Sequence, residues 1–154
     1  MKQRLGIAQA MLNNPRILIL DEPTAGLDPK ERVRFRNLIS AFSKDRIVIL
    51  STHIVSDVEF IAEDIIMMKD GQILHFGKTQ EITTEIDGQV WECTVPTSRA
   101  EQYSETLNIS NLRNIENNCT VLRVISEQSP MENAINVEPT LEDLYLFYFK
   151  GVNE

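Results

Sequence analysis

The sequence predicts an α/β fold over its first half, followed by a small α+β extension. In the first 80 residues, short continuous apolar runs alternate with segments of helical periodicity. This rhythm is typical of a layered α/β domain. Because 80 residues hold too few strands to cover both faces of such a sheet, this half is expected to be only part of a domain.

The second observation behind this prediction is an uneven distribution of charge. Residues 1–80 contain 11 basic and 10 acidic residues, whereas residues 81–154 contain 4 basic and 13 acidic residues. Such an asymmetry indicates a change of module. The Asp87-Gly88 turn signal gives the boundary, so we predict one domain over residues 1–87 and a second over residues 88–154.

The elements of the first half follow from apolar spacing and turn residues. A helix over residues 4–12 is expected to end before Pro15. Two continuous apolar runs, residues 17–20 and 47–50, are typical of strands that are buried on both faces of a parallel sheet. The other predicted elements are helices over residues 29–44 and 55–62, and a hairpin of residues 65–68 and 72–76 around Asp70-Gly71.

The second half is predicted to alternate strands and helices. The apolar patterns indicate strands over residues 90–95 and 121–126 and helices near residues 100–107 and 141–149. Thr140, after Pro139 and three residues before Asp143, fits a capping box that starts the last helix. The apolar end of that helix is expected to pack on its own small domain.

Composition excludes several classes of protein. With 15 basic and 23 acidic residues the net charge is −8, which argues against non-specific binding to nucleic acid. The longest apolar run has six residues, far short of the ~20 that span a bilayer, so direct membrane insertion is not expected. Cys93 and Cys119 form no C-x-x-C pair and are expected to be reduced thiols.

The segment that indicates chemistry is I-L-I-L-D-E-P-T-A-G-L-D-P, residues 17–29. A buried strand that ends in Asp21 and Glu22 places two carboxylates at the carboxyl edge of a sheet, where α/β proteins bind ligands. The first acid is suited to hold Mg²⁺ on a nucleotide, and the second to accept a proton from an attacking water. His53, after the second strand, is expected at the same edge, where it would donate a hydrogen bond to a terminal phosphate.

These residues resemble the ATP-binding subunits of ABC transporters, which are P-loop nucleotidases. Residues 17–21 resemble the Walker B strand, residues 25–28 the D-loop, His53 the switch histidine, and residues 1–4 the tail of the L-S-G-G-Q-x-Q-R signature. The resemblance covers about residues 1–80. It implies that Asp21 binds Mg²⁺ through water, that Glu22 is the general base and that His53 senses the γ-phosphate. It also assigns Gln3 and Asp28 to the ATP site, with Asp28 coupling two sites of a head-to-tail dimer.

The second half resembles the carboxyl-terminal extension of the ATPase subunits of drug- and peptide-export systems. The resemblance rests on the E-P-T-L-E-D stretch over residues 138–143.

Three residues or segments have simpler interpretations. Asp28 before Pro29 is a good helix N-cap with or without a partner. His75, in a predicted hairpin strand, is interpreted as structural. Gly77-Lys78-Thr79 imitates the end of a Walker A loop, but five residues instead of four separate Gly71 from Gly77, so we interpret it as the exit from the hairpin.

The sequence contains no Walker A loop, and it begins inside the signature motif. We therefore expect it to correspond to the carboxyl-terminal part of an ATPase subunit that neither binds MgATP well nor hydrolyses it alone. The two apolar strands would then be exposed edges that favour association.

The leading hypothesis is an ATP-binding subunit that powers export. Its implied partners are a transmembrane permease and a second ATP-binding subunit, and its implied location is the cytoplasmic face of the membrane. One alternative is a non-catalytic module whose acidic region over residues 81–154 binds a partner or regulates. Another is an ABC ATPase of translation or DNA repair, against which the net charge of −9 in that region (4 − 13) argues.

Overall fold

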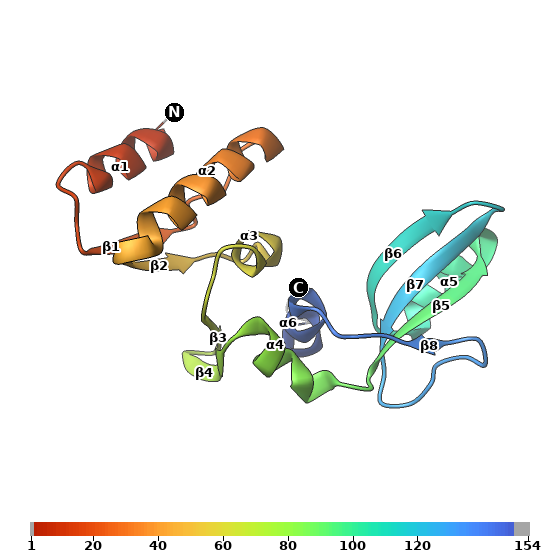
Figure 1. Cartoon of the computed structure of the whole chain (residues 1–154). Helices are drawn as coiled ribbons and strands as arrows, with labels where there is room; N and C mark the ends of the chain where they lie inside the picture. The colour runs from red at the N-terminus through yellow and green to blue at the C-terminus, as the bar shows by residue number, and fades with distance from the viewer. Residues whose placement is uncertain (1, 150–154) are drawn as a thin grey trace. The chain divides into compact units, whose positions relative to one another are not determined.

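The structure is a computed structural model that describes residues 2–149, with residues 2–4 described by their backbone only. The chain folds as two compact units, residues 1–63 and residues 64–154, and both combine helices with small sheets (Figure 1). The predicted α/β class is therefore confirmed. Within the described residues, no helix is long and apolar enough to cross a membrane.

The first unit is built around two parallel strands in register. β1 (Ile17–Asp21) pairs with β2 (Ile47–Ser51), and Asp21 lies opposite Ser51 at the carboxyl end. Both strands lie where the apolar runs predict them. The helices of this unit are α1 (Lys2–Met11), α2 (Pro29–Phe42), the 3₁₀ turn η1 (Ser43–Asp45) and α3 (Val55–Glu59).

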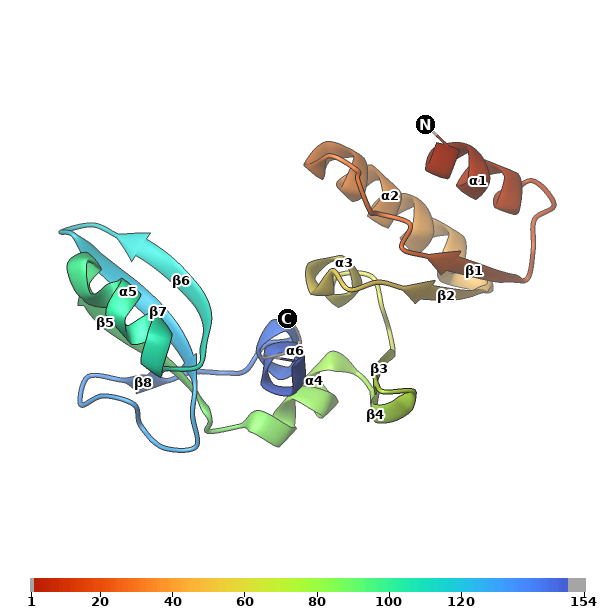
Figure 2. The same ribbon diagram turned by 180° about the vertical axis from the view of Figure 1, so that it is seen from behind.

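Helices α1 and α2 cover one face of this two-stranded sheet, as Figures 1 and 2 show from opposite sides. The core between them contains Leu18 and Leu20 of β1 and Phe35 and Ile39 of α2. The prediction that both faces of the strands are buried is wrong for this unit, since none of its described residues covers the other face. It presents four isoleucines with exposed fractions of 55%, 71%, 59% and 53%: Ile17, Ile19, Ile47 and Ile49.

The second unit begins with the predicted hairpin. β3 (Ile65–Lys69) and β4 (Gln72–Gly77) pair antiparallel, and Asp70 and Gly71 both have positive φ in the turn. β4 ends at Gly77, and Lys78 is the N-cap of the short helix α4 (Thr79–Ile82). The interpretation of Gly77-Lys78-Thr79 as the hairpin exit is confirmed. The 3₁₀ turn η2 (Thr83–Ile86) follows.

The next elements are β5 (Val90–Pro96), α5 (Thr97–Thr106), β6 (Ile109–Ile115), β7 (Cys119–Ile125) and β8 (Ile135–Asn136). The four strands form an antiparallel sheet in the order β6-β7-β5-β8. On one face of this sheet, Cys93, Val95, Leu122 and Val124 pack against Ala100 of α5, with Trp91 at the margin of this core. Alternation of burial along the strands explains why both central strands were predictable. Cys93 and Cys119 are free thiols, as predicted.

The last helix, α6 (Leu141–Phe149), packs within the second unit. Leu144 is fully buried, Lys69 donates a hydrogen bond from Nζ to the carbonyl of Tyr148 at 2.8 Å, and the Tyr148 hydroxyl donates to Glu85. Burial and the Glu85 carboxylate together raise the pKa of Tyr148 to about 12. His75 lies against the Tyr148 ring with centroids 5.3 Å apart, and its Nε2 is 2.9 Å from Glu85 Oε2. These contacts agree with a structural role for His75.

Because of these contacts, the hairpin belongs to the same compact unit as α6, and the two compact units divide after Glu63. The predicted boundary at Asp87-Gly88 divides the sequence by charge and by resemblance and not by packing, and it stays a prediction.

Candidate functional site

The carboxyl ends of β1 and β2 bring together the acidic pair and the segment that follows the second strand. Asp21 and Ser51 are the last residues of the two strands, and the Ser51 hydroxyl donates a hydrogen bond to Asp21. The Glu22 N–H donates to the Ser51 carbonyl at 2.9 Å, which extends the pairing by one residue. Parallel register therefore places residues that lie 30 apart in the sequence at one sheet edge.

Glu22 holds His53 at this edge. Glu22 Oε1 lies 2.8 Å from His53 Nδ1 and accepts a hydrogen bond from the His53 backbone N–H at 3.0 Å. Burial favours the neutral acid, but hydrogen bonds from His53 and Thr52 outweigh it, so the pKa of Glu22 lies below its ordinary value. The carboxylate is therefore ionised at neutral pH and able to accept a proton.

The backbone of Glu22 is strained, with a φ of 44°. The left-handed region costs a residue with a side chain roughly 1–2 kcal/mol. Such outliers persist where the surrounding structure holds them, and they concentrate at functional sites. The turn that begins here places the Glu22 carboxylate against Thr52 and His53, which follow β2.

One carboxylate at this edge is of the kind that binds magnesium. In the part of the chain that the structure describes, no group of three or more His, Cys, Asp or Glu residues is placed to hold a metal ion. Mg²⁺ in nucleotide sites takes one or two carboxylates, and phosphates and water supply the other ligands. Asp21, which is exposed at the strand end, fits a Mg²⁺ ion that arrives with a nucleotide.

The other predicted site residues lie elsewhere. Asp28 is the N-cap of α2, with its Oδ1 accepting a hydrogen bond from the Glu31 N–H at 2.8 Å and Pro29 following it. The capping role is therefore confirmed. The side chain of Gln3, and Met1 of the predicted signature tail, lie outside the described residues.

Loss of this cap has a measurable cost. We expect Asp28→Ala to lower the free energy of unfolding by about 1 kcal/mol, because the Glu31 N–H loses its acceptor. The measurement is a urea titration followed by far-ultraviolet circular dichroism. Asp28→Asn keeps an acceptor and is expected to match the unsubstituted chain, so an equal loss in both variants would contradict the capping account.

Two hydroxyl residues of this edge were not assigned roles by the sequence. Ser51 contacts Asp21, and Thr52 Oγ1 donates to Glu22 Oε2 at 3.1 Å. The signal was present, because both residues follow the second strand next to His53, yet hydroxyl residues after strands are too common to single out.

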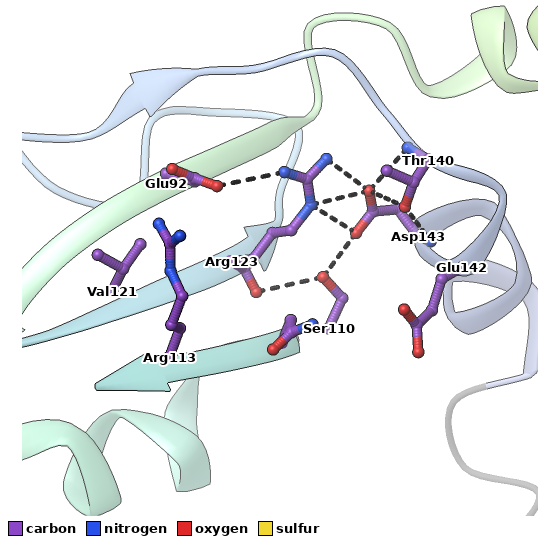
Figure 3. Close-up of a pocket in the computed structure, with 9 residues that line it drawn as sticks. Glu92, Ser110, Arg113, Val121, Arg123, Thr140, Glu142 and Asp143 are labelled. Atoms are coloured by element: carbon purple, nitrogen blue, oxygen red, sulfur yellow. Dashed lines mark hydrogen bonds and ion pairs between the residues drawn. The ribbon is translucent and has the colours of Figure 1, made fainter. Parts of the chain in front are cut away.

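A separate polar pocket of about 280 Å³ lies in the second unit, on the sheet face opposite α5 (Figure 3). Asp143, which is 1% exposed, pairs with Arg123 through three contacts of 2.8–3.1 Å. Asp143 also accepts hydrogen bonds from Ser110 at 2.6 Å and from the Thr140 N–H and hydroxyl at 2.9 and 2.8 Å. The predicted capping box is thus present, since Asp143 N–H also donates to Thr140 Oγ1.

This cluster is internally satisfied. Burial favours the neutral form of Asp143, but the hydrogen bonds from Arg123, Ser110 and Thr140 lower the pKa of Asp143 below its ordinary value. Arg123 also bonds to Glu92 at 3.3 Å and to the Glu138 carbonyl at 2.6 Å. The charges face each other, which indicates that the cluster joins the sheet to the start of α6.

Comparisons with known proteins return ATP-binding proteins of ABC transporters, and the family-model match includes Asp21 and Glu22. Residues 1–25 match the family model described as "ABC transporter". The uncharacterized ABC transporter ATP-binding protein YxlF of Bacillus subtilis is 39% identical over 95 residues, which cover 62% of this chain and 32% of YxlF. The lantibiotic transport ATP-binding protein SrtF of Streptococcus pyogenes is 47% identical over 75 residues, covering 48% of this chain and 33% of SrtF.

A third relative extends into the second half. The uncharacterized ABC transporter ATP-binding protein YhcH of Bacillus subtilis is 31% identical over 134 residues, covering 84% of this chain and 42% of YhcH. A match of that extent cannot be contained in residues 1–87. The chain spans about a third of YxlF and SrtF and less than half of YhcH.

Proposed function

We propose, on the premise that this chain is homologous to the ATP-binding proteins of ABC transporters, that it supplies the catalytic carboxylates and the switch histidine of an ATP-hydrolysing transport subunit. The observation that carries the proposal is the cluster of Asp21, Glu22 and His53 at one sheet edge, with His53 bonded to Glu22.

Each residue has a role that follows from its chemistry. Asp21 would bind the Mg²⁺ that accompanies ATP, directly or through water, and this ion supplies charge neutralisation at the β- and γ-phosphates. Glu22, ionised and exposed by about a third of its side chain, would accept the proton of the attacking water. His53, 70% exposed, would donate a hydrogen bond to the terminal phosphate.

The partners follow from the same homology. A subunit of this kind would act with a transmembrane permease and a second ATP-binding subunit at the cytoplasmic face of the membrane, and export is the transport we propose. Asp28 would contribute to the coupling of two sites in a head-to-tail dimer, in addition to capping α2. Gln3 would contribute to nucleotide binding as part of the signature tail.

We further propose that the 154-residue polypeptide does not turn over ATP alone. Its sequence has no G-x-x-x-x-G-K-[ST] loop, so it lacks the backbone N–H groups and the lysine that cradle phosphates in this class of enzyme. In calorimetry we expect no saturable MgATP binding by the chain. Saturable binding that disappears in Asp21→Asn would contradict this expectation.

A chimera tests the proposed function directly. The amino-terminal part of YxlF is joined to residue 1 of this chain, and MgATP hydrolysis is measured. We expect turnover that Glu22→Gln lowers by about 10²–10⁴-fold, the usual contribution of a general base. Glu63→Gln, an exposed acid of the same unit, is the matched control and should retain turnover. Equal activity in both variants would refute the role of Glu22.

One observation favours a second candidate function. The acidic region lies in a compact unit with its own core of Cys93, Val95, Leu122 and Val124, as a partner-binding or regulatory module would require. That function predicts partner binding that is unaffected by Asp21→Asn and Glu22→Gln. A permease-bound ATPase predicts that both substitutions lower MgATP hydrolysis by the chimera.

A further inference from the structure

Thr52 occupies a central position in the hydrogen bonds at the candidate site. Its hydroxyl donates to Glu22 Oε2 at 3.1 Å and accepts a hydrogen bond from the Ile54 N–H at 3.1 Å. Thr52 is half-buried. The side chain therefore links the Glu22 carboxylate to the backbone at the start of α3.

The direction of both hydrogen bonds is fixed by chemistry. A backbone N–H only donates, and an ionised carboxylate only accepts. The Thr52 hydroxyl must therefore accept from Ile54 and send its single proton to Glu22. Because the hydroxyl oxygen accepts from the Ile54 N–H, its proton points toward Glu22, and the donor is preorganised.

The two oxygens of the Glu22 carboxylate have different neighbours. Both contacts from His53 reach Oε1, whereas Thr52 reaches Oε2. His53 is 70% exposed, and a side chain that meets a phosphate must be free to turn. The contact from Thr52 does not depend on the orientation of the imidazole ring.

We propose that Thr52 is a positioning residue that orients the Glu22 carboxylate at the sheet edge. This inference rests on the proposed function, because it deepens the role of Glu22 as the general base. Thr52 acts through Glu22 and through the turn before α3. Threonine or serine satisfies this role, since each carries a hydroxyl at the required position, while valine, of the same shape, lacks it.

The competing account is purely local. A threonine hydroxyl that accepts from the N–H two residues later forms a common turn, and Thr52 would then stabilise the segment with no effect on Glu22. The two accounts differ in the protection of the His53 amide. This amide donates to Glu22 at 3.0 Å and not to Thr52.

Hydrogen exchange at single-amide resolution in the nucleotide-free 154-residue chain separates them. Thr52→Val removes the acceptor of the Ile54 amide, so both accounts predict faster exchange there. Only the positioning account also predicts faster exchange at His53. The expected increase is roughly threefold to tenfold, which corresponds to the free energy of a modest hydrogen bond. Thr52→Ser should restore both amides. Ser51→Ala, which removes a hydroxyl that contacts Asp21, is the matched control and should leave His53 unchanged.

A second background shows whether Thr52 acts through Glu22. In Glu22→Ala the His53 amide has lost its acceptor, so adding Thr52→Val should change its exchange no further. Unchanged His53 protection in Thr52→Val, with faster exchange at Ile54, would overturn the proposal. If Thr52→Val also speeds exchange in β1 and β2, Glu22→Ala alone is the test. Faster exchange of the Ile54 amide in Glu22→Ala supports the coupling of Thr52 to Glu22, and unchanged exchange of that amide overturns it.

The measurement is independent of ATP hydrolysis. If Thr52→Val leaves the His53 amide unchanged and the chimera is active, Thr52 has no positioning role and the proposed function stands. If Thr52→Val speeds exchange of the His53 amide and the chimera is inactive, the contact between Thr52 and Glu22 is supported and the proposed function is refuted.

Discussion

Replacement of Asp143 by alanine is expected to lower the free energy of unfolding of the second unit by about 3–5 kcal/mol, the usual cost of removing one partner from a buried ion pair. The Arg123 side chain is only 18% exposed, and it would lose the carboxylate that receives three of its contacts. Ser110 and Thr140 would lose their acceptor as well. The measurement is the urea dependence of far-ultraviolet circular dichroism.

Two further variants test the cause. Glu142→Ala removes an exposed acid from the same turn of α6 and should change stability by less than about 0.5 kcal/mol. Joint replacement of Arg123 by Met and Asp143 by Leu leaves no unpaired charge between these two positions, so it should destabilise less than Asp143→Ala. A double variant as unstable as the single one would contradict the ion-pair account.

The same pair gives a pH dependence of known sign. Because the pKa of Asp143 is lower in the folded chain than its ordinary value, the stabilisation is present above the ordinary aspartate pKa of about 3.9. It is lost as the pH falls from there through the lower folded-state pKa. Asp143→Asn should flatten this part of the stability profile.

The second large effect concerns association. We expect the unsubstituted chain to self-associate through the exposed face of Ile17, Ile19, Ile47 and Ile49, and joint substitution of Ile19 and Ile49 by lysine to shift it strongly toward monomer. These two side chains lie opposite each other in the β1–β2 register and are 71% and 53% exposed. Burial of an isoleucine contributes about 1.5–3 kcal/mol, so losing two weakens association by at least two orders of magnitude.

Light scattering over a concentration series measures this effect. The control is Ile135→Lys, because Ile135 is 68% exposed on the short strand β8. This control should leave the association unchanged. A monomeric unsubstituted chain with cooperative melting would contradict the prediction.

Local patterns predicted the elements whose side chains meet a core. The apolar runs identified β1 and β2, and the capping box identified the first residue of α6, because these signals lie within a few residues of one another. Residues 109–115 were not predicted as a strand. Ser110, Asn111 and Asn114 have low strand propensity, and β6 is formed by pairing with β7 across an Asn117-Asn118 turn in which both residues have positive φ.

Burial was less predictable than element type. A strand with a continuous apolar run is buried on both faces only where other elements pack on both faces of its sheet. The sequence of the strand does not show which of those elements are present. The candidate site was also predictable only in part. Asp21, Glu22 and His53 were predictable because parallel strands end at one edge, whereas the contact of Thr52 with Glu22 depends on the left-handed backbone of Glu22.

The position of Trp91 has a spectroscopic consequence. The chain contains one tryptophan, and its indole Nε1 donates to the Ser126 carbonyl at 3.0 Å at the margin of the core of the second unit. Intrinsic fluorescence excited at the red edge of indole absorption therefore reports on that unit alone. Combined with circular dichroism, which averages over the whole chain, a single denaturation series shows whether the second unit unfolds together with the rest of the chain.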